Sequence, residues 1–295
     1  MKPAPFDYHA PEALDEAAGL LHEHGDDAKV LAGGQSLVPM LALRLTRFAH
    51  LVDVTRIGEL RGITRDDGHV RVGATTPQAV AEHDTVLAAA VPLVARALPH
   101  IGHFQIRNRG TVGGSLAHAD PASELPAVAL ALDATFEAAS TRGRREIGAA
   151  DFFTGTWSTA LADDEVLVAT RFPVWSGRCG FTVHEVARRS GDFALAGVAA
   201  AVEIGGDDTL TRVALGLFGV ASTPQRATAA EGALVGRGTT DRAELGATLR
   251  DASRAGAAEI DGVDDVHATA AYRTRVAAHL METALSAAIE EARGV

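Results

Sequence analysis

The sequence predicts an α+β protein with about two domains. Its 295 residues exceed what one small core usually needs. The C-terminal part has three strand-like segments followed by two long helical patterns, an order typical of α+β folds. Pro, Gly and Ser cluster between Phe172 and Gly180, which indicates a boundary there. We therefore expect one domain at residues 1–176, with subdomains at about 1–55 and 56–176, and a second domain at 177–295.

The first 55 residues are predicted to form a small βα unit packed on a helix. Apolar residues recur at helical spacing between Pro11 and His24. Short apolar runs at 29–32 and 51–54 are typical of buried strands. Ser36 follows Gly33 and Gly34 and is expected to cap a helix that runs to Leu45.

The segment 56–176 mixes a hairpin, helices and strands. Asp66-Asp67-Gly68 is a strong turn signal between strands expected at 62–64 and 69–73. Thr76-Pro77 is expected to start a helix, with Thr76 as its cap and proline at the first helical position. Further elements are expected as helices at 93–98 and 125–132 and as strands at 135–138 and 166–172.

The segment 177–295 reads as a small sheet followed by helices. Strands are expected at 181–187, 195–204 and 210–218, and the turn 205–208 joins the last two as a hairpin. Two alanine-rich helical patterns follow at 242–257 and 268–288.

The charge balance argues against some binding partners. The chain has 27 basic and 38 acidic residues and a net charge of −11. A strongly acidic surface disfavours binding to the phosphates of nucleic acid or to an anionic membrane. A local pocket for one small anion remains compatible with this charge.

Cysteine usage restricts the chemistry of the chain. Cys179 is its single cysteine, so an internal disulfide, an iron–sulfur cluster and a cysteine-rich zinc site are all excluded. This usage is typical of a reducing cytoplasm. The N-terminus lacks the apolar core of a signal peptide, and the longest apolar stretches are too short to span a bilayer. We expect a soluble cytoplasmic protein.

Two segments pair glycines with a hydroxyl residue: Ala32-Gly33-Gly34-Gln35-Ser36 and Thr111-Val112-Gly113-Gly114-Ser115. Glycine lets a ligand approach main-chain N–H groups, and successive N–H groups form an anion-binding nest. Two such turns about 80 residues apart could hold a diphosphate from both sides, as a dinucleotide cofactor requires. The alternative is two ordinary glycine turns, since neither segment matches G-x-G-x-x-G or a Walker loop.

Acidic residues follow the second glycine segment directly. Asp120 and Glu124 would repel a diphosphate, but they suit hydrogen bonds from ribose hydroxyls or from ring N–H groups. The alternative is that Asp120 or Ser123 caps the helix that begins near Leu125. His118 and Asp120 could form half of a metal site, but no third ligand stands at suitable spacing, so we expect no metal. The chain has no G-x-S-x-G motif, and no catalytic residue is expected.

The residues 32–37 and 110–121 resemble the two FAD signatures of the flavoprotein subunits of molybdenum hydroxylases. The similarity is strongest to the aerobic carbon monoxide dehydrogenase and xanthine dehydrogenase type. It covers nearly the whole chain, from Phe6-Asp7-Tyr8 through Gly191-Asp192-Phe193 to Ala271-Tyr272-Arg273.

The resemblance implies a fold and a cofactor. The fold would be a two-subdomain FAD-binding domain of the PCMH type, followed by a three-stranded antiparallel sheet with a helical bundle. FAD would lie extended between the subdomains, with its diphosphate on the two glycine segments, Glu124 near the adenosine ribose, and Phe193 over one flavin face. The cofactor-binding residues expected in this way are Leu31, Ala32, Gly33, Gly34, Gln35, Ser36, Leu37, Ile101, Thr111, Val112, Gly113, Gly114, Ser115, Asp120, Glu124, Leu167 and Phe193.

Three positions depart from the family pattern. Phe193 stands where relatives often have Tyr, so a phenol hydrogen bond is missing. Glu185 stands where many relatives have Lys near the flavin, which puts an electrostatic role of that position in doubt. Ser115 replaces a frequent Asn, but its hydroxyl can still donate to phosphate.

The resemblance also implies a role in electron transfer. FAD would relay electrons from the clusters of an iron–sulfur small subunit to NAD, quinone or oxygen, while a molybdopterin large subunit oxidises the substrate. The expected assembly is a heterotrimer that dimerises. Two alternatives stay open: a stand-alone FAD-dependent oxidase or reductase with its own substrate, and a non-redox nucleotide-binding protein.

Overall fold

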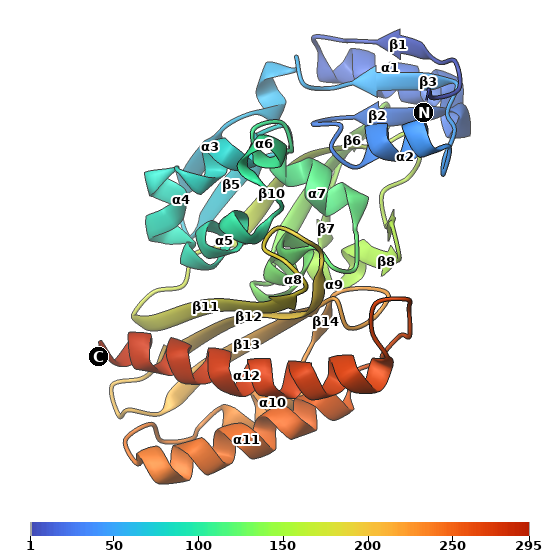
Figure 1. Cartoon of the computed structure of the whole chain (residues 1–295). Coiled ribbons are helices and arrows are strands. Elements are labelled where there is room, and N and C mark those ends of the chain that lie inside the picture. The colour runs from blue at the N-terminus through green and yellow to red at the C-terminus, as the bar shows by residue number, and fades with distance from the viewer. Residues whose placement is uncertain (1, 295) are drawn as a thin grey trace.

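The computed structural model describes residues 2–294, and its three main sheets belong to three successive stretches of the chain. Figure 1 shows these stretches as layers, from the N-terminal unit through a middle unit to the C-terminal unit. The α+β prediction is confirmed.

The N-terminal unit contains a parallel sheet with the strand order β1-β3-β2. Its elements are β1 (Asp7–His9), α1 (Leu14–His24), a 3₁₀ turn (Gly25–Asp27), β2 (Ala28–Leu31), α2 (Leu37–Leu43) and β3 (His50–Asp53). Helix α1 buries Leu14, Ala17, Ala18 and Leu21, the positions that its helical spacing predicted. Because β2 and β3 run in parallel, Gly33 and Gly34 follow the carboxyl end of the sheet.

The middle unit is built on an antiparallel sheet with the order β4-β5-β10-β6-β7. Its strands are β4 (Ile63–Asp66), β5 (His69–Gly73), β6 (Thr135–Ser140), β7 (Gly143–Gly148) and β10 (Val166–Pro173), beside the small pair β8 (Phe153–Gly155) and β9 (Ser158–Thr159). Its helices are α3 (Gln78–Glu82), α4 (Thr85–Ala90), α5 (Pro92–Ala97), α6 (Phe104–Arg107), α7 (Val112–His118), α8 (Glu124–Ala131) and α9 (Ala149–Phe152), with 3₁₀ turns at Gly58–Leu60 and Leu98–His100.

Two predicted helix caps are wrong. Helix α3 begins at Gln78, after Pro77, and the buried Thr76 accepts a hydrogen bond from the Gly62 N–H instead of capping the helix. Helix α2 does begin after Ser36, but the Ser36 side chain makes no capping hydrogen bond, and the helix ends at Leu43.

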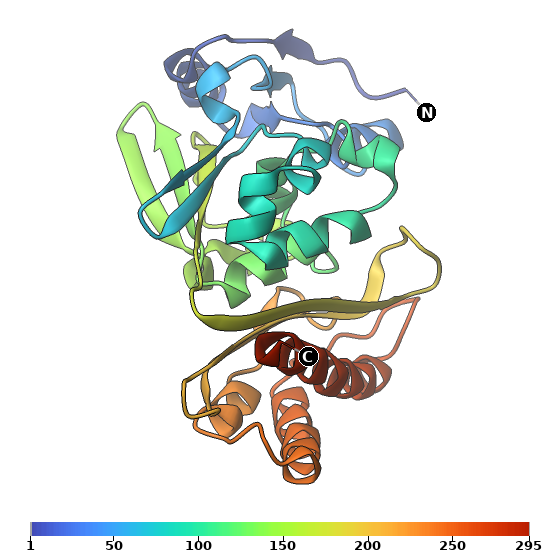
Figure 2. The same cartoon turned by 90° about the vertical axis from the view of Figure 1, so that its left-hand side faces the viewer.

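The C-terminal unit has one antiparallel sheet, β11-β12-β13-β14. The three long strands match the prediction, and a fourth strand of two residues extends the sheet at one edge. Its elements are β11 (Arg178–Ala187), β12 (Ala194–Ile204), β13 (Leu210–Phe218), β14 (Gln225–Arg226), α10 (Thr228–Leu234), α11 (Arg242–Ala258) and α12 (Ala270–Arg293). Figure 2 shows this sheet lying between α12 on one side and the helices of the middle unit on the other.

Glycines on the sheet permit close packing on both faces. A Cβ on Gly180 would lie 1.8 Å from the carbonyl oxygen of Ala288 in α12. A Cβ on Gly216 would lie 2.1 Å from the carbonyl oxygen of Ala127 in α8. Since neither distance is compatible with a side chain, these glycines set how closely α12 and α8 approach the sheet.

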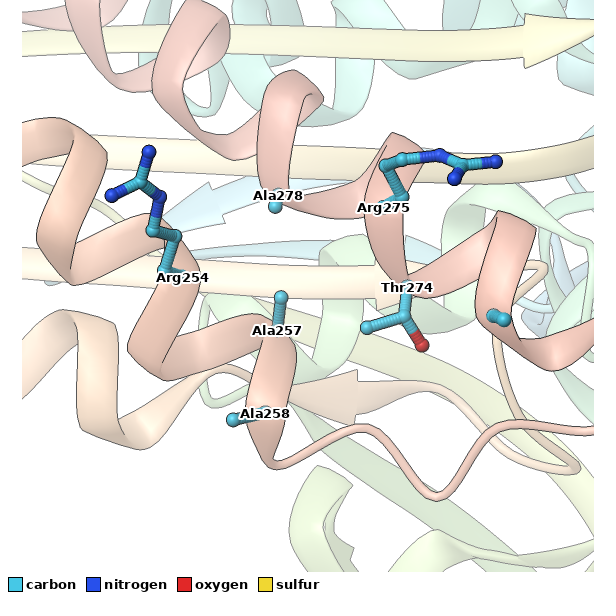
Figure 3. Close-up of a pocket in the computed structure, with 7 residues that line it drawn as sticks. Arg254, Ala257, Ala258, Thr274, Arg275 and Ala278 are labelled. Atoms are coloured by element: carbon cyan, nitrogen blue, oxygen red, sulfur yellow. The ribbon is translucent and has the colours of Figure 1, made fainter.

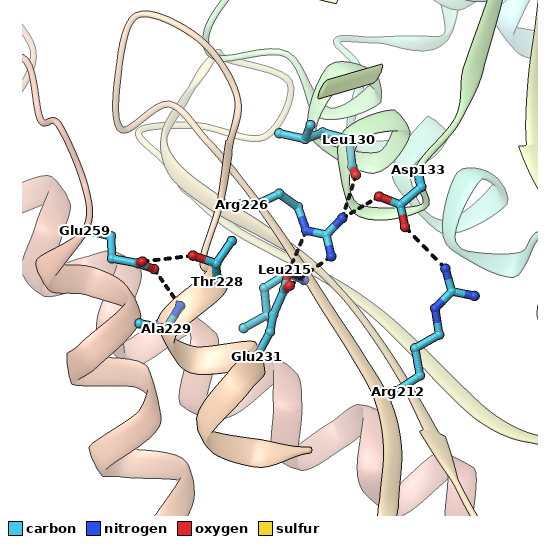
Figure 4. A network of polar contacts seen from close by, with 9 residues as sticks. All are labelled: Leu130, Asp133, Arg212, Leu215, Arg226, Thr228, Ala229, Glu231 and Glu259. Atoms are coloured by element: carbon cyan, nitrogen blue, oxygen red, sulfur yellow. Dashed lines mark hydrogen bonds and ion pairs between the residues drawn. The ribbon is translucent and has the colours of Figure 1, made fainter. Parts of the chain in front are cut away.

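Arg226 connects the C-terminal unit to the middle unit (Figure 4). Its guanidinium donates to the Leu130 carbonyl at 3.1 Å and to Asp133 at 2.8 Å, both at the end of α8, and to Glu231 in α10. These charge-assisted bonds hold β14 against α8. Within residues 2–294, no helix has the length and apolar character that crossing a membrane requires.

Candidate functional site

The two glycine segments are in contact in the folded chain. A Cβ on Gly33 would lie 2.1 Å from the Arg109 carbonyl oxygen and 2.7 Å from the Gly110 Cα. A Cβ on Gly114 would lie 3.5 Å from the Cβ of Ala32. Residues about 80 positions apart therefore form one structural feature. Glycine at position 33 is required for this approach.

The first segment offers a run of unused main-chain donors. Within residues 2–294, the N–H groups of Gly33 through Leu37 donate to no acceptor in the protein. Gly34 has φ +73°, a conformation that favours glycine, and the Gln35 side chain donates to the Gly33 carbonyl at 3.1 Å. All five residues are half-buried. Successive free N–H groups at the start of a helix are suited to bind an anion.

The second segment has its main-chain donors already occupied. Val112 and Gly113 donate to the carbonyls of Thr76 and Ala74, at 3.0 Å and 2.9 Å. Gly114 and Ser115 donate to the Thr111 hydroxyl and carbonyl, at 3.0 Å and 3.1 Å. The expectation that both segments present free amides is therefore wrong for residues 112–115, because Thr111 caps α7 and an isolated bridge joins Thr111 to Pro77.

The residues of the second segment also differ in their exposure to solvent. Thr111 and Val112 are 3% and 0% exposed, and Gly113 packs against Ala74 so closely that a Cβ would lie 2.4 Å from the alanine Cβ. Gly114 and Ser115 are half-buried. The accessible groups of this segment are thus the Gly114 backbone and the Ser115 hydroxyl, while the other residues position them.

A buried carboxyl lies at the start of α8. The Glu124 side chain is buried, and burial, reinforced by the nearby Glu185, raises its pKa to about 8. Glu124 is therefore protonated and neutral at pH 7. A neutral carboxylic acid does not repel a bound phosphate, and it can both donate and accept hydrogen bonds.

His100 and Glu185 lie beside this carboxyl. His100 Nδ1 is 3.4 Å from Glu185 Oε1, and this hydrogen bond raises the pKa of His100. Glu185 Oε2 is buried and has no partner within residues 2–294. Glu185 stands on β11 and His100 precedes the predicted site residue Ile101, so the cluster connects the C-terminal unit to the middle unit. Sequence reasoning did not select His100, because nothing in its local spacing indicates a partner 85 residues away.

Both carboxylate oxygens of Asp120 accept hydrogen bonds from groups of the protein. Its Oδ1 accepts from the Ala122 N–H at 2.9 Å, and its Oδ2 accepts from Trp157 Nε1 at 3.0 Å. The capping alternative is wrong, because neither Asp120 nor the Ser123 side chain bonds to the first turn of α8.

The residues predicted to contact the flavin rings lie in different environments. Ile101 is half-buried, Leu167 is 6% exposed in the core of the middle unit, and Phe193 is 68% exposed. The turn that carries Phe193 packs on the Ile101 region, since a Cβ on Gly191 would lie 2.7 Å from a carbon of the His103 ring. The fold thus brings Phe193 and Ile101 to one region. Leu167 instead lies on β10, with its side chain in the core of the middle unit.

A separate groove lies between α11 and α12, on the side of the C-terminal sheet away from the glycine segments (Figure 3). Its volume is about 450 Å³. The groove is lined by Arg254, Ala257, Ala258, Ala271, Thr274, Arg275 and Ala278. None of these residues belongs to the predicted site.

Comparison with known families matches both parts of the chain. A model described as the FAD binding domain in molybdopterin dehydrogenase matches residues 4–175. A model described as the CO dehydrogenase flavoprotein C-terminal domain matches residues 181–288.

Curated relatives match nearly the whole chain. It is 37% identical over 288 residues to the carbon monoxide dehydrogenase medium chain of Hydrogenophaga pseudoflava, with 98% of each chain covered. It is also 37% identical to the 6-hydroxypseudooxynicotine dehydrogenase complex subunit alpha of Paenarthrobacter nicotinovorans, with 99% and 97% covered.

Solved structures share the fold. A carbon monoxide dehydrogenase from Hydrogenophaga pseudoflava that lacks the Mo-pyranopterin moiety of its cofactor matches with a TM-score of 0.94 and 38% identity, over 99% of both chains. Quinoline 2-oxidoreductase from Pseudomonas putida 86 matches with a TM-score of 0.92 and 34% identity, again over 99% of both chains.

Proposed function

The chain belongs to the family of FAD-binding subunits of molybdopterin dehydrogenases, and we propose that it serves as the flavoprotein subunit of a molybdenum hydroxylase complex. The observation that carries this proposal is the contact of Gly33 with Arg109 and Gly110, beside five unused amides at the start of α2. An FAD diphosphate needs many hydrogen-bond donors and close access to the backbone, and this arrangement supplies both.

The residues present fit FAD with unequal roles for the two segments. We assign the diphosphate to the free N–H groups of Gly33 through Leu37, with the Ser115 hydroxyl as a further donor. Glu124 can bind a ribose hydroxyl without repelling the nearby diphosphate, because its raised pKa keeps its carboxyl group neutral. The proposed contact set keeps these members of the set expected from sequence: Leu31, Ala32, Gly33, Gly34, Gln35, Ser36, Leu37, Ile101, Gly114, Ser115, Asp120, Glu124 and Phe193. The buried Thr111, Val112 and Gly113 position Gly114 and Ser115, and Leu167 belongs to the core of the middle unit.

Bound FAD supplies the electron-accepting and electron-donating chemistry, and the chain supplies binding and orientation. A relay of this kind needs no general acid or base, so we assign no catalytic residue. The single Cys179 leaves the chain without the ligands of an iron–sulfur cluster. We therefore assign the clusters to a small partner subunit and substrate oxidation to a large molybdopterin subunit.

Two further points follow from the same proposal. We place the division between the FAD-binding domain and the C-terminal domain near residue 176, which is supported by the two family models that match residues 4–175 and 181–288. We also propose a cytoplasmic location, because a single unpaired cysteine is typical of a reducing compartment.

Purification of the chain alone and together with its partner subunits tests this function. The isolated chain should be yellow, should release FAD on denaturation, and should not oxidise a substrate by itself. Oxidation by the isolated chain would favour the stand-alone flavoenzyme instead. A colourless chain that takes up ADP or NAD in preference to added FAD would overturn the proposal in favour of a non-redox nucleotide-binding protein.

A further inference from the structure

Three histidines from different elements meet in the N-terminal unit, away from the glycine segments. His9 ends β1, His24 ends α1 and His50 begins β3 (Figure 1). One ring nitrogen from each lies within 4.8 Å of one ring nitrogen from each of the others, and all three residues are half-buried. We refer to them as the histidine trio.

The rings are tightly arranged. His9 Nε2 lies 3.2 Å from His50 Nδ1. The rings of His24 and His50 stack with centroids 3.7 Å apart and planes 8° apart. The His24 ring nitrogens have no hydrogen-bond partner within residues 2–294, so a lone pair of this ring is free to bind something else. Asp7 Oδ2 lies 3.9 Å from His50 Nδ1 and adds a carboxylate at the edge of the trio.

This geometry points to a metal site: we propose that His9, His24 and His50 bind one divalent transition-metal ion, with Zn²⁺ as the ion of best-matched chemistry. Imidazole nitrogens are preferred ligands of Zn²⁺, Cu²⁺ and Ni²⁺ and poor ligands of Mg²⁺ and Ca²⁺. Two nitrogens bound at tetrahedral Zn²⁺ lie roughly 3.3 Å apart, given Zn–N bonds of about 2.0–2.1 Å. The His9–His50 nitrogen separation of 3.2 Å matches this spacing.

Binding requires one local adjustment. Parallel stacked rings direct their lone pairs side by side rather than toward one point. A turn of the His24 ring brings its nitrogen toward the nitrogens of His9 and His50. The fourth ligand of the metal ion would be a water molecule or the exposed carboxylate of Asp7.

We expect a bound metal ion to fix the N-terminal strand to the rest of its unit. Strand β1 has three residues, two of them exposed, and lies at the edge of the sheet, where β3 is its one partner within residues 2–294. An ion held by β1, α1 and β3 would join this edge strand to both neighbouring elements. His50 pairs with Ala28 at the amino end of β2, whereas the glycine segment follows the carboxyl end of β2. Metal binding and FAD binding are therefore measurable independently.

Calorimetric titration of ZnCl₂ into the full-length, tag-free chain, freed of metal with a chelator, tests the proposal. We expect one Zn²⁺ per chain with a dissociation constant on the order of 10 µM or tighter.

Matched variants identify the ligands. His24→Ala should weaken Zn²⁺ binding at least about 10-fold. His22→Ala serves as the control, because His22 is exposed, stands two residues away on the same helix and lies outside the trio. If His24→Ala does not fold, as judged by circular dichroism, His9→Gln tests the same ligand set. Absence of stoichiometric Zn²⁺ binding by the unmodified chain, or equal binding by the His24 and His22 variants, would overturn the proposal.

Discussion

Replacing Gly33 by alanine directly perturbs the contact between the two glycine segments. The new Cβ would lie 2.1 Å from the Arg109 carbonyl oxygen, whereas a carbon and a carbonyl oxygen normally approach to about 3.3 Å. The segments must therefore separate by roughly 1 Å. Overpacking of this kind costs about 1–3 kcal/mol. At roughly 2–4 °C per kcal/mol, we expect Tm to fall by about 2–12 °C.

The same separation should weaken FAD binding. Loss of two hydrogen bonds to the charged diphosphate, at about 1.5 kcal/mol each, corresponds to roughly a 100-fold weaker affinity. Fluorescence titration of the apo-protein with FAD measures the affinity, and differential scanning fluorimetry measures Tm.

A matched glycine provides the control. Gly19 lies in α1 of the same unit, and a Cβ there meets nothing within 4 Å. Gly19→Ala should raise stability by up to about 1 kcal/mol, because alanine favours the helix, and should leave FAD affinity unchanged. If Gly33→Ala matched Gly19→Ala in both Tm and FAD affinity, the contact between the segments would not have the role that we assign to it.

Three further predictions concern buried or half-buried groups. Folded apo-protein holds the Glu124 proton up to about pH 8, whereas the unfolded chain releases it near pH 4.5, so stability should fall by up to about 5 kcal/mol as pH rises through this range. Glu124→Gln should remove that part of the pH dependence in urea unfolding, and parallel curves for both proteins would contradict the assignment. Arg273→Met should cost about 3–5 kcal/mol in the same assay, because the buried guanidinium donates to the carbonyls of Leu195 at 2.7 Å and Gly219 at 2.5 Å; a cost under about 1 kcal/mol would show that these bonds contribute little. Burial raises the pKa of Cys179 to about 11, so its alkylation at pH 8 should be much slower than that of a free thiol, and labelling at the free-thiol rate would refute this.

Local pattern predicted the elements that bury one regular face. Helix α1 shows this, since Leu14, Ala17, Ala18 and Leu21 follow helical spacing and are all buried. The sequence did not predict strand β7. Its residues Arg144, Arg145 and Glu146 are exposed and Ile147 is its one buried residue, so the segment has no alternation of apolar and polar residues. Its pairing with β6 is a tertiary effect that the local sequence does not encode.

The candidate site was predictable in its parts but not in its division of roles. The glycine pairs marked both segments, because close backbone approach needs glycine. That the amides of Val112 and Gly113 are occupied could not be predicted, since their acceptors Thr76 and Ala74 are distant in sequence, whereas Gly114 and Ser115 donate to the nearby Thr111. The histidine trio was invisible for the same reason, as its members come from three elements.

Hydrogen exchange of individual amides, with and without FAD, tests the central claim most directly. The amides of Gly33 through Leu37 lack protein acceptors, so added FAD should slow their exchange strongly. The amides of residues 112–115 are already bonded and should change much less. Stoichiometric FAD binding that left the exchange of residues 33–37 unaltered would contradict the account.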